Sequence, residues 1–466
     1  MTKNSNPPHS SNCIADAAEA KAFFEANPDI DAIDIMFTNM SGVPRGKRLR
    51  QHEALAVYED GRFLPGSVLV IDITGKDCEE TGLVWDDGDA DRRCWPVPGT
   101  LVRAPWLGEG AAQFTTSFYE LDGTPNDLDP RHVLGSVIDR LAADGLTPVV
   151  AVELEFFLLE QDGSGRPAIA RGLNSGDQPQ FNEVYSLREM EDFKPFFDDL
   201  YAACDVQGIP LESGISEYAP GQFELTLRHK PDALGATDDA VMYKRLVKGV
   251  AAQHGMIASF MAKPFVEQAG SGMHLHVSMN DKDGNNAFAS EDPEGSPLLR
   301  HAIGGMKDFL GESMAIFAPN ANSFRRFKAN SYAPVAPTWG VNNRTVSLRV
   351  PAGSPASRHV EHRICGADAN PYLAVAAVLA GMHYGMTNQV DPGPAIVGNG
   401  YEQAPEDYRL PNHWPTAIEA FKTSPRMRDY LGDRFVTHYS TVKEVEMARF
   451  FGEVTELDYS WYMHNA

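Results

Sequence analysis

The sequence predicts a mixed α and β protein, with a small β-rich N-terminal domain followed by a larger domain of alternating helices and strands. Its 466 residues are enough for two or three domains. Short apolar runs separated by turn residues fill the first part, about 120 residues, which is an ordinary domain size. From Pro130 onward longer segments of helical and strand periodicity alternate. The larger domain is therefore α/β or α+β.

The N-terminal part contains a candidate hairpin. Residues 30–37 (IDAIDIMF) read as a strand, and 43–49 (VPRGKRL) would return as its hairpin partner across the turn 39–42. We expect residues 1–15 to be a disordered leader, because they are polar and rich in Pro, Ser and Asn. Residues 122–129, rich in Asp with Gly, Pro and Asn, would be the linker to the second domain. The other expected elements are a helix at 15–25 and a strand-rich stretch at 66–74.

The second domain begins with a helix over 130–144, which has Pro in its first turn and Gly145 beyond its end. Residues 148–159 have the β-branched, aromatic and aliphatic composition of a buried strand. Residues 370–386 are apolar on all sides, which predicts a deeply buried helix. The remaining expected elements are helices at 192–207 and 238–254 and strands at 261–279 and 343–350.

Composition excludes several classes of protein. The net charge is −24, which disfavours binding to nucleic acid or to anionic membranes. The chain has five single cysteines and no CxxC pair, so we expect neither disulfides nor a zinc site of that kind, but a reducing cytoplasm. No apolar run reaches membrane-spanning length, and the N-terminus lacks a signal-peptide core.

Two carboxylates interrupt the strand at 148–159. Side chains alternate along a strand, so Glu153 and Glu155 share one face, about 7 Å apart. Buried acids at this spacing repel one another, and a hard divalent cation such as Mg²⁺ or Mn²⁺ is a natural partner. A half-solvated strand whose polar face meets water explains the same pattern equally well.

Two further groups could complete such a site. Glu217 and Glu224 flank a Pro-Gly turn and could point from a hairpin toward one place, although exposed loop acids are the commoner case. His274 and His276 follow Gly-Ser-Gly and share a strand face. Taken singly, either histidine is more commonly a hydrogen-bonded core residue than a metal ligand. The preceding glycines, however, permit close approach of a ligand to the backbone.

Arginines gather between residues 320 and 363, where Glu361 is the only acid. Guanidinium groups bind phosphates and carboxylates bidentately, so this cluster favours an anionic ligand such as a nucleotide over a salt-bridged surface. P-loop, GxGxxG and nucleophile-elbow motifs are absent from the sequence. Acids, a histidine and arginines together indicate metal-nucleotide phosphoryl transfer onto a carboxylate. The arginines are Arg325, Arg326, Arg344, Arg349, Arg358 and Arg363.

Six motifs resemble the glutamine synthetase superfamily in order and spacing: VELEFFLL, EYAPGQFE, FMAKPFVEQAGSGMHLHVSM, PNANSFRRF, NNRTVSLRVP and VEHRICGADANPYL. The resemblance covers roughly residues 30–466. It implies an α+β fold with an N-terminal β-grasp domain over 16–125. Residues 126–466 would form the catalytic domain, a curved antiparallel sheet with flanking helices. The family also implies a homo-oligomer, a double-ring dodecamer with active sites between neighbouring subunits.

The resemblance implies roles for individual residues. Two to three Mg²⁺ or Mn²⁺ ions would be held, the first by Glu155, Glu217 and Glu224 and the second by Glu153, His274 and Glu361. Substrate glutamate would contact Arg326, Arg363, Gly270 and Glu155. ATP, the second substrate, would contact Glu212, His276, Ser278, Arg344 and Arg349. Catalytic roles would fall to Arg344, Tyr332 and Asn39.

Three positions depart from the ammonia-using members of that family. Asn39 stands where those members carry an Asp that attracts ammonium, Tyr332 stands where their flap carries a Glu, and Ala269 replaces an Asn. Two negative charges are thus exchanged for neutral groups, one of them aromatic, which weakens an ammonium site and suits an alkylamine. The sequence most resembles the γ-glutamylpolyamine (γ-glutamylputrescine) synthetase group.

The expected reaction is ATP-dependent ligation of the glutamate γ-carboxylate to an organic amine, with putrescine or a related polyamine favoured. It would proceed through γ-glutamyl phosphate. The alternatives are a γ-glutamyl ligase for methylamine or ethanolamine, and an ammonia-using glutamine synthetase. Two alternatives belong to other functional classes: a kinase that transfers phosphate without forming an amide, and a non-catalytic assembly protein. Tyr332 and acids of an adjoining subunit are the candidates for the base that deprotonates the amine.

Overall fold

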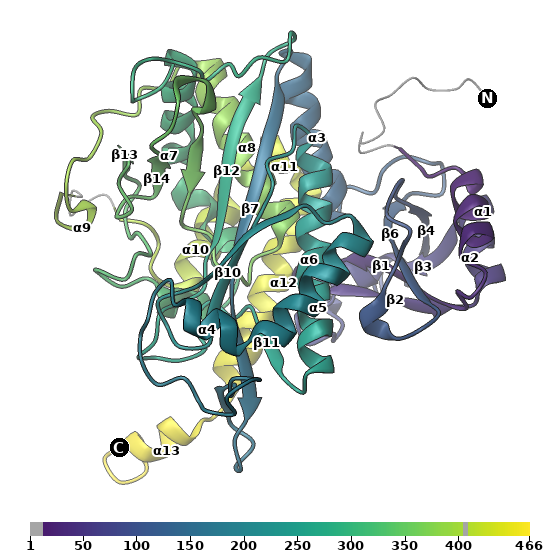
Figure 1. Ribbon diagram of the computed structural model, residues 1–466. Coiled ribbons are helices and arrows are strands. Elements are labelled where there is room, and N and C mark those ends of the chain that lie inside the picture. Colours follow the sequence, from purple (N-terminus) through teal and green to yellow (C-terminus); the bar gives the residue numbers. More distant parts are fainter. Residues whose placement is uncertain (1–12, 404–408) are drawn as a thin grey trace.

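The computed structural model describes residues 13–403 and 409–466 and contains two sheets with flanking helices (Figure 1). Strands between residues 32 and 119 form a six-stranded sheet, and strands between 147 and 362 form a nine-stranded one. The predicted disordered leader lies mainly in residues 1–12, outside the described residues. Ala15 is buried and its N–H donates to the Pro96 carbonyl at 3.0 Å, which fixes the chain just before the first helix.

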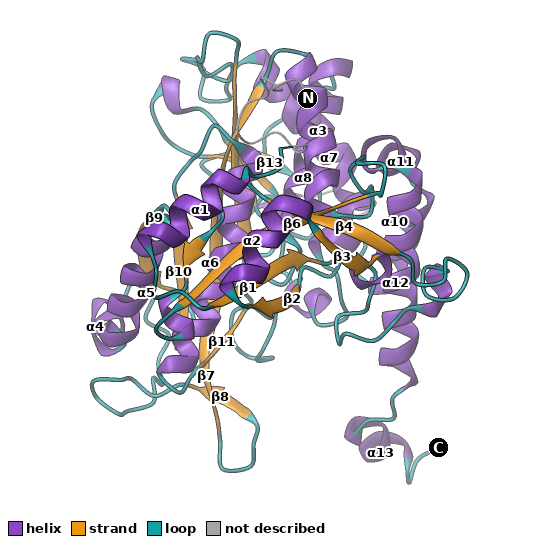
Figure 2. Ribbon diagram, turned by 90° about the vertical axis from the view of Figure 1, so that its right-hand side faces the viewer, coloured by secondary structure: helices purple, strands orange, loops and turns teal. Residues whose placement is uncertain are grey.

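The small sheet has the order β2-β1-β6-β4-β3, with β5 paired to β6. The predicted hairpin is confirmed, since β1 and β2 pair antiparallel, while β1 runs parallel to β6. Helices α1 and α2 lie on one face of this sheet (Figure 2). The bounds are α1 Ala17–Ala26, β1 Ala32–Thr38, β2 Pro44–Leu49, α2 Gln51–Asp60, β3 Arg62–Pro65, β4 Asp91–Pro96, β5 Val102–Arg103 and β6 Ala111–Tyr119.

The strand-rich stretch predicted at 66–74 is wrong. Residues Gly66–Leu69 form a 3-10 helix, and the chain then turns at Asp72. The Asp72 carboxylate accepts hydrogen bonds from the Thr74 hydroxyl at 2.7 Å and the Lys76 N–H at 2.9 Å, which closes a tight loop. The apolar residues that suggested a strand are instead buried beneath this loop, because Leu69 and Val70 pack into the main core.

The large sheet is built around β7, a 15-residue strand at Thr147–Gln161. Its order is β13-β14-β15-β12-β7-β10-β9, with β8 and β11 also paired to β7. All of these pairs are antiparallel except β13 with β14. The other strands are β8 Pro167–Ile169, β9 Leu211–Ser216, β10 Gln222–Leu227, β11 Ile257–Ser259, β12 Met273–Asn280, β13 Trp339–Val341, β14 Leu348–Val350 and β15 Val360–His362.

One face of β7 is apolar and lies against helices. Val152, Leu154 and Phe156 are fully buried in the main core, which removes their apolar surface from water. The predicted helices are all present within a few residues at each end. They are α3 Pro130–Ala143, α5 Lys194–Gln207, α6 Ala233–Gln253 and α8 Pro371–Asn388. The others are α4 Leu187–Asp192, α7 Pro297–Phe317, α9 Gly400–Gln403, α10 Trp414–Thr423, α11 Pro425–Leu431, α12 Asp433–Gly452 and α13 Glu456–Tyr462.

Two predicted strands are too long. In the segment predicted at 261–279 the strand begins only at Met273, because the preceding chain bends back and the Ser271 N–H donates to the Ala262 carbonyl at 2.9 Å. In the segment predicted at 343–350 only β14 is extended. There the Asn343 side chain accepts from the Thr345 N–H at 2.9 Å and forms a turn instead.

The predicted fold class is confirmed as mixed α+β, with a large, mainly antiparallel sheet flanked by helices. The β-grasp arrangement of the small sheet stays a prediction. Within the described part of the chain, the helices lack the combination of length and apolar character that a bilayer-crossing segment requires.

Helices α7 and α8 cross with their backbones in contact, at a point where glycines face one another. A Cβ added to Gly385 would lie 2.1 Å from the His301 carbonyl oxygen and 2.6 Å from the Gly305 nitrogen. Both obstacles are backbone atoms, which cannot rotate away. The buried helix predicted at 370–386 therefore needs glycine at this position to reach its partner.

We expect Gly385→Ala to lower the free energy of unfolding by about 1–3 kcal/mol, the usual range for overpacking a core. Gly311→Ala is the matched control in α7, because its Cβ would meet only Pro411 Cδ at 3.9 Å. It should be neutral or stabilising by up to about 1 kcal/mol, since alanine favours the helix. Denaturant unfolding of both variants measures this, and equal stabilities would contradict the crossing.

Candidate active site

The strand pairing around β7 brings the predicted acids and histidines to one face of the sheet. Glu155 lies opposite Glu224 of β10, and Glu153 lies opposite His274 of β12. One strand further, His276 lies opposite Glu361 of β15. Because the side chains alternate along each strand, all of these residues point away from the helix-covered face. The carboxylates and imidazoles thus form a continuous row across four strands.

Two groups in this row have metal-binding geometry. The ligand atoms of Glu153, His274 and Glu361 lie within 4.8 Å of one another, and so do those of Glu155, Glu224 and His274. His274 Nδ1 is 2.6 Å from Glu153 Oε1, and its Nε2 is 4.0 Å from Glu155 Oε1. His274 therefore stands between the two groups. Glu217 adjoins the second one through a hydrogen bond between its carboxyl and that of Glu224.

The second group holds more negative charge than the protein can neutralise. Burial, and then repulsion from Glu153, Glu155 and Glu217, raises the pKa of Glu224 to about 11. Burial also raises the pKa of Glu155 and that of Glu217, against partly compensating contacts. Carboxylate oxygens crowded in this way are the donors that hard divalent cations prefer. The donor set therefore fits Mg²⁺ or Mn²⁺.

The first group is paired with cationic side chains. Burial opposes ionisation of Glu153, but hydrogen bonds with His274 and His276 outweigh it and hold the pKa of Glu153 well below its usual range. For Glu361, the charge of Arg363 and of both histidines overcomes burial and lowers the pKa to about 2. The Glu361 carboxylate accepts from Arg349 Nη1 at 2.8 Å and also pairs with Arg363. These two carboxylates are therefore ionised at neutral pH.

A glycine-walled corner adjoins Glu155. The Gly272 N–H donates to Glu155 Oε2 at 2.7 Å, and Gln222 Nε2 donates to the Gly270 carbonyl at 3.0 Å. A Cβ on Gly270 would meet Arg326 Cγ at 2.8 Å, so glycine lets the buried Arg326 lie beside this backbone. The predicted glutamate contacts Arg326, Gly270 and Glu155 are thus brought together. Arg326 Nη1 donates to the Ile364 carbonyl at 2.6 Å, and the fourth predicted contact, Arg363, directly precedes Ile364 in the chain.

The residues predicted to contact ATP or the amine lie around the row and differ in how far they are exposed to solvent. Tyr332 and Arg344 line one cavity of about 710 Å³, and Arg344 is close enough for its charge to lower the pKa of Glu217. Tyr332 is 60% exposed and has a left-handed backbone, with φ of 57°. Ser278 is buried further along β12, while Glu212 is exposed on β9 and pairs with Arg228 at 3.2 Å.

Asn39 does not join this row within a single chain. It lies in the turn between β1 and β2, and its side-chain hydrogen bonds join it to Val43 and Ile71 and not to the acids. Its side chain is fully buried, accepts from the Val43 N–H at 3.0 Å and donates to the Ile71 carbonyl at 3.4 Å. Asn370 holds the same turn by donating to the Asn39 carbonyl at 3.0 Å. The contacts within one chain give Asn39 a turn-forming role, and its predicted catalytic role stays a prediction.

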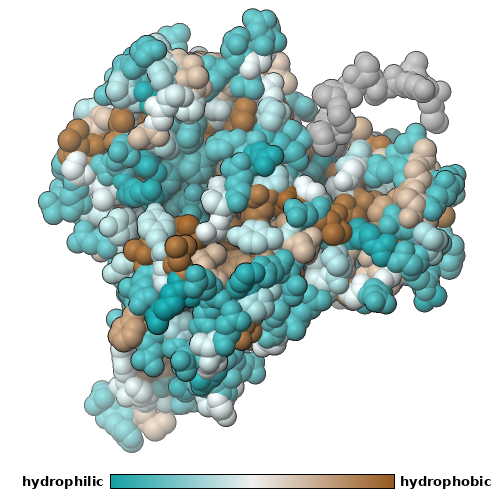
Figure 3. Space-filling model, viewed as in Figure 1, coloured by the Kyte–Doolittle hydropathy of each residue, from teal (hydrophilic) through white to brown (hydrophobic). Residues whose placement is uncertain are grey.

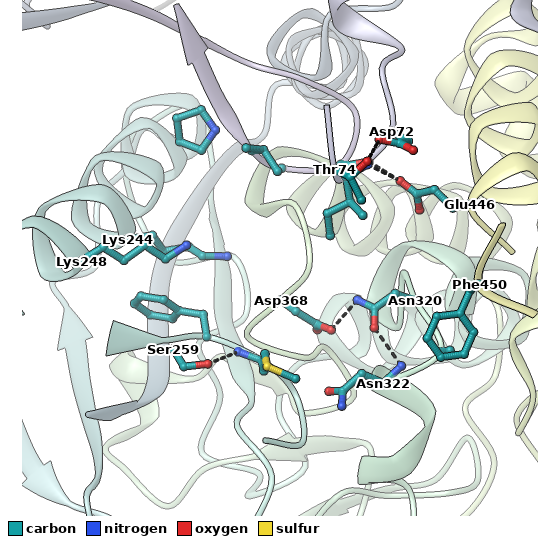
Figure 4. Close-up of a pocket in the computed structure, with 18 of the residues that line it drawn as sticks. Asp72, Thr74, Lys244, Lys248, Ser259, Asn320, Asn322, Asp368, Glu446 and Phe450 are labelled. Atoms are coloured by element: carbon teal, nitrogen blue, oxygen red, sulfur yellow. Dashed lines mark hydrogen bonds between the residues drawn. The ribbon is translucent and has the colours of Figure 1, made fainter. Parts of the chain in front are cut away.

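A separate cavity of about 840 Å³ lies where the small and large parts of the chain meet (Figure 4). The space-filling view shows hydrophobic residues gathered along this junction (Figure 3). Lys244 and Lys248 extend toward it from α6, and burial lowers the pKa of Lys244 to about 7. None of the predicted metal ligands is among the residues that line this cavity.

Sequence reasoning missed two residues that position the acids. Glu189 of α4 accepts from the Ser216 hydroxyl at 2.5 Å and from the Gly221 N–H at 2.7 Å, which ties together both sides of the turn between Glu217 and Glu224. Gln222 also reaches Glu155, at 3.4 Å. Gln222 lies inside the PGQFE motif and alternates with Glu224, which was a usable signal. Glu189 had none, because its role depends on a tertiary contact.

Comparisons with known proteins agree with this geometry. Glutamine synthetase, catalytic domain, matches residues 127–462. Gamma-glutamylputrescine synthetase PuuA of Escherichia coli (strain K12) is 40% identical over 452 residues, which cover 96% of this chain and 95% of that protein. Glutamate–isopropylamine ligase of Pseudomonas sp is 34% identical over 427 residues, 90% of this chain and 92% of that one.

Among solved structures, one described as a GmaS/ADP complex superposes with a TM-score of 0.82 at 27% identity and covers 97% of this chain and 100% of that chain. The family match spans more than half of the sequence, and both relatives are covered over nearly their whole length. The chain belongs to the glutamine synthetase family.

Proposed function

We propose that this protein is an ATP-dependent ligase that joins the γ-carboxylate of glutamate to an organic amine, with putrescine or another polyamine as the favoured acceptor. The observation that carries the proposal is the row of acids and histidines on one face of β7, bordered by Arg326, Arg349 and Arg363. The similarity to a gamma-glutamylputrescine synthetase over 96% of the chain supports the choice of amine. A ligase for a monoamine is the second candidate, supported by the similarity to a glutamate–isopropylamine ligase.

Two to three Mg²⁺ or Mn²⁺ ions would be held on this face, one by Glu155, Glu217 and Glu224 and another by Glu153, His274 and Glu361. Divalent ions there would neutralise the phosphates of ATP and the charge that develops during phosphoryl transfer. The raised pKa of Glu224 fits this role, because a bound cation removes the repulsion that raises it.

The arginines would bind the two anionic substrates. Arg344 and Arg349 would contact the nucleotide phosphates, and Arg326 and Arg363 the glutamate carboxylates. Arg349 and Arg363 each have a buried Nε–H without a hydrogen-bond partner among the described residues, so both keep donor capacity beyond their pairing with Glu361. Oriented in this way, the γ-carboxylate would attack the terminal phosphate and form γ-glutamyl phosphate, which the amine then displaces.

The amine would bind near Tyr332. The cavity that Tyr332 lines also contains Asp292 and Glu294, whose carboxylates can attract an alkylammonium group. Arg300 Nη1 lies 3.5 Å from one of these carboxylates and 3.7 Å from the other, so it offsets part of their charge. An aromatic face beside acids suits a long cation with an apolar chain better than it suits ammonium.

The assembly would be a homo-oligomer, a dodecamer as in the family, in which a neighbouring subunit brings its β1–β2 turn to this site. Asn39 would take part through that turn, as an uncharged residue where ammonia-using relatives place a carboxylate. The buried amide of Asn39 supports a role in shaping the turn more than direct contact with the amine.

The test is amine-dependent phosphate release, with glutamate, ATP and Mg²⁺ held constant and ammonia, methylamine, isopropylamine, ethanolamine, putrescine and spermidine compared at equal concentration. Putrescine or spermidine should give the highest kcat/KM. Preference for a monoamine would favour the second candidate. Ammonia as the best acceptor would overturn the proposed specificity, and phosphate release without amide formation would overturn the ligase.

Tyr332 variants extend the same panel. Tyr332→Glu restores the charge found at this position in ammonia-using relatives, and should raise kcat/KM for ammonia while lowering it for putrescine, each by about tenfold or 1.4 kcal/mol. Tyr332→Gln has the same size without the charge, so it should lose putrescine activity and gain nothing with ammonia. Identical profiles for the two variants would exclude charge at this position as the determinant.

Removal of divalent ions should make stability depend on pH. Glu224 has a folded-state pKa of about 11 against an ordinary 4.5, so the folded state binds its proton more tightly than the unfolded state. Stability is then greatest below about pH 4.5 and falls as the pH rises toward 11. In EDTA, the melting temperature should decrease between about pH 5.5 and 8.5.

Saturating Mg²⁺ should remove most of that slope, because a bound cation favours the ionised carboxylate. Glu224→Gln is the matched variant. It should flatten the slope in EDTA while keeping the fold, since the amide has the same shape and no charge. The same slope in the wild type and in Glu224→Gln would show that another group titrates.

A further inference from the structure

Three histidines from distant parts of the chain meet beside the acid row. His276 lies on β12, His229 follows β10, and His359 precedes β15. Their ring centroids are 5.9 Å apart for His229 and His276, 5.4 Å for His229 and His359, and 5.3 Å for His276 and His359. One ring nitrogen of each lies within 4.8 Å of a ring nitrogen of both others. Of the three, only His276 has a role in the proposed reaction.

The hydrogen bonds of two of these rings turn one nitrogen of each toward the other. His359 Nδ1 is 2.8 Å from the Ser357 carbonyl, which can only accept, so Nδ1 carries the hydrogen and Nε2 is unprotonated. His276 Nε2 faces a Glu153 carboxylate oxygen at 3.4 Å, which favours a hydrogen on Nε2 and leaves Nδ1 as the nitrogen turned toward His359. The two remaining nitrogens, His276 Nδ1 and His359 Nε2, are 3.1 Å apart. At this distance either a shared proton or a metal ion joins the two nitrogens.

We propose that His229, His276 and His359 form a binding site for a transition-metal dication such as Zn²⁺, separate from the carboxylate ligands for Mg²⁺. Imidazole nitrogens suit Zn²⁺, Co²⁺, Ni²⁺ and Cu²⁺, whereas Mg²⁺ prefers oxygen donors. Three histidine ligands, whose bonding nitrogens give up any proton to the metal, also leave a tetrahedral ion one position for water or for an anionic ligand.

The geometry needs little adjustment. With metal–nitrogen bonds of about 2.0–2.1 Å, two ligands of a tetrahedral ion are about 3.4 Å apart, close to the 3.1 Å observed. His229 is exposed and can rotate toward the other two rings. Burial lowers the pKa of His229 and that of His359, and the nearby negative charges of Glu212 and Glu361 offset this only in part. The carboxylate of Glu153 supports His276 from behind, as acids commonly do for metal-bound histidines.

The test is calorimetric titration of Zn²⁺ into the untagged full chain in saturating Mg²⁺, which occupies the carboxylate face. The wild type should bind one Zn²⁺ tightly per chain. His359→Ala and His229→Ala should each weaken binding at least about 100-fold. Mutating even a residue that only hydrogen-bonds to a metal ligand commonly lowers metal affinity by about 10–100-fold. His52→Ala removes an exposed histidine on α2 and should leave the affinity unchanged.

Two further variants separate this site from its neighbours. His359→Gln can still donate to the Ser357 carbonyl, so it keeps the loop and should still lose Zn²⁺ affinity. Glu224→Gln disables the proposed Mg²⁺ face and should keep the Zn²⁺ site, so failure of the ligase proposal would not remove it. Absence of tight Zn²⁺ binding, equal affinity in the wild type and His359→Ala, or loss of binding in Glu224→Gln would each overturn the proposal.

Discussion

Mutual repulsion among buried carboxylates is the constraint on which the rest of the structure depends. Glu153, Glu155, Glu217, Glu224 and Glu361 converge on one face, where water cannot screen them fully. The chain neutralises only part of this charge, with His274, His276, Arg349 and Arg363 around Glu153 and Glu361. The part around Glu224 stays uncompensated. That imbalance supports the proposed cation site, because burying these acids without a cation would cost the fold stability.

The scaffold holds this arrangement through the opposite face of the same strands. Val152, Leu154 and Phe156 of β7 are fixed in the core beneath α3 and α6, which sets the direction in which Glu153 and Glu155 point. The antiparallel register then places Glu224 and His274 opposite them. Close helix packing at Gly385 and the glycines beside Arg326 bring distant segments within reach. Site geometry thus rests on backbone contacts that larger side chains would prevent.

The alternation of Glu153 and Glu155 on a buried strand was predictable from sequence, since it follows from the two-residue period of a strand. The apolar helix at 370–386 was predictable from its uniform composition. Register was not, because nothing local specifies that Glu224 faces Glu155. The apolar stretch 66–74 was wrongly predicted as a strand. Its apolar residues are buried by a tertiary contact, since Leu69 of a 3-10 helix packs in the main core, and not by pairing with another strand. The turn role of Asn39 and the support given by Glu189 also depend on partners far away in the sequence.

We propose that the acid row binds two divalent cations on opposite sides of His274. Crystals grown with Mn²⁺ and measured at the manganese absorption edge test it most directly, because anomalous peaks locate the ions without assumptions about activity. We expect one peak bounded by Glu155, Glu217 and Glu224 and a second bounded by Glu153, His274 and Glu361. Manganese bound elsewhere while this face lacks a peak would contradict it.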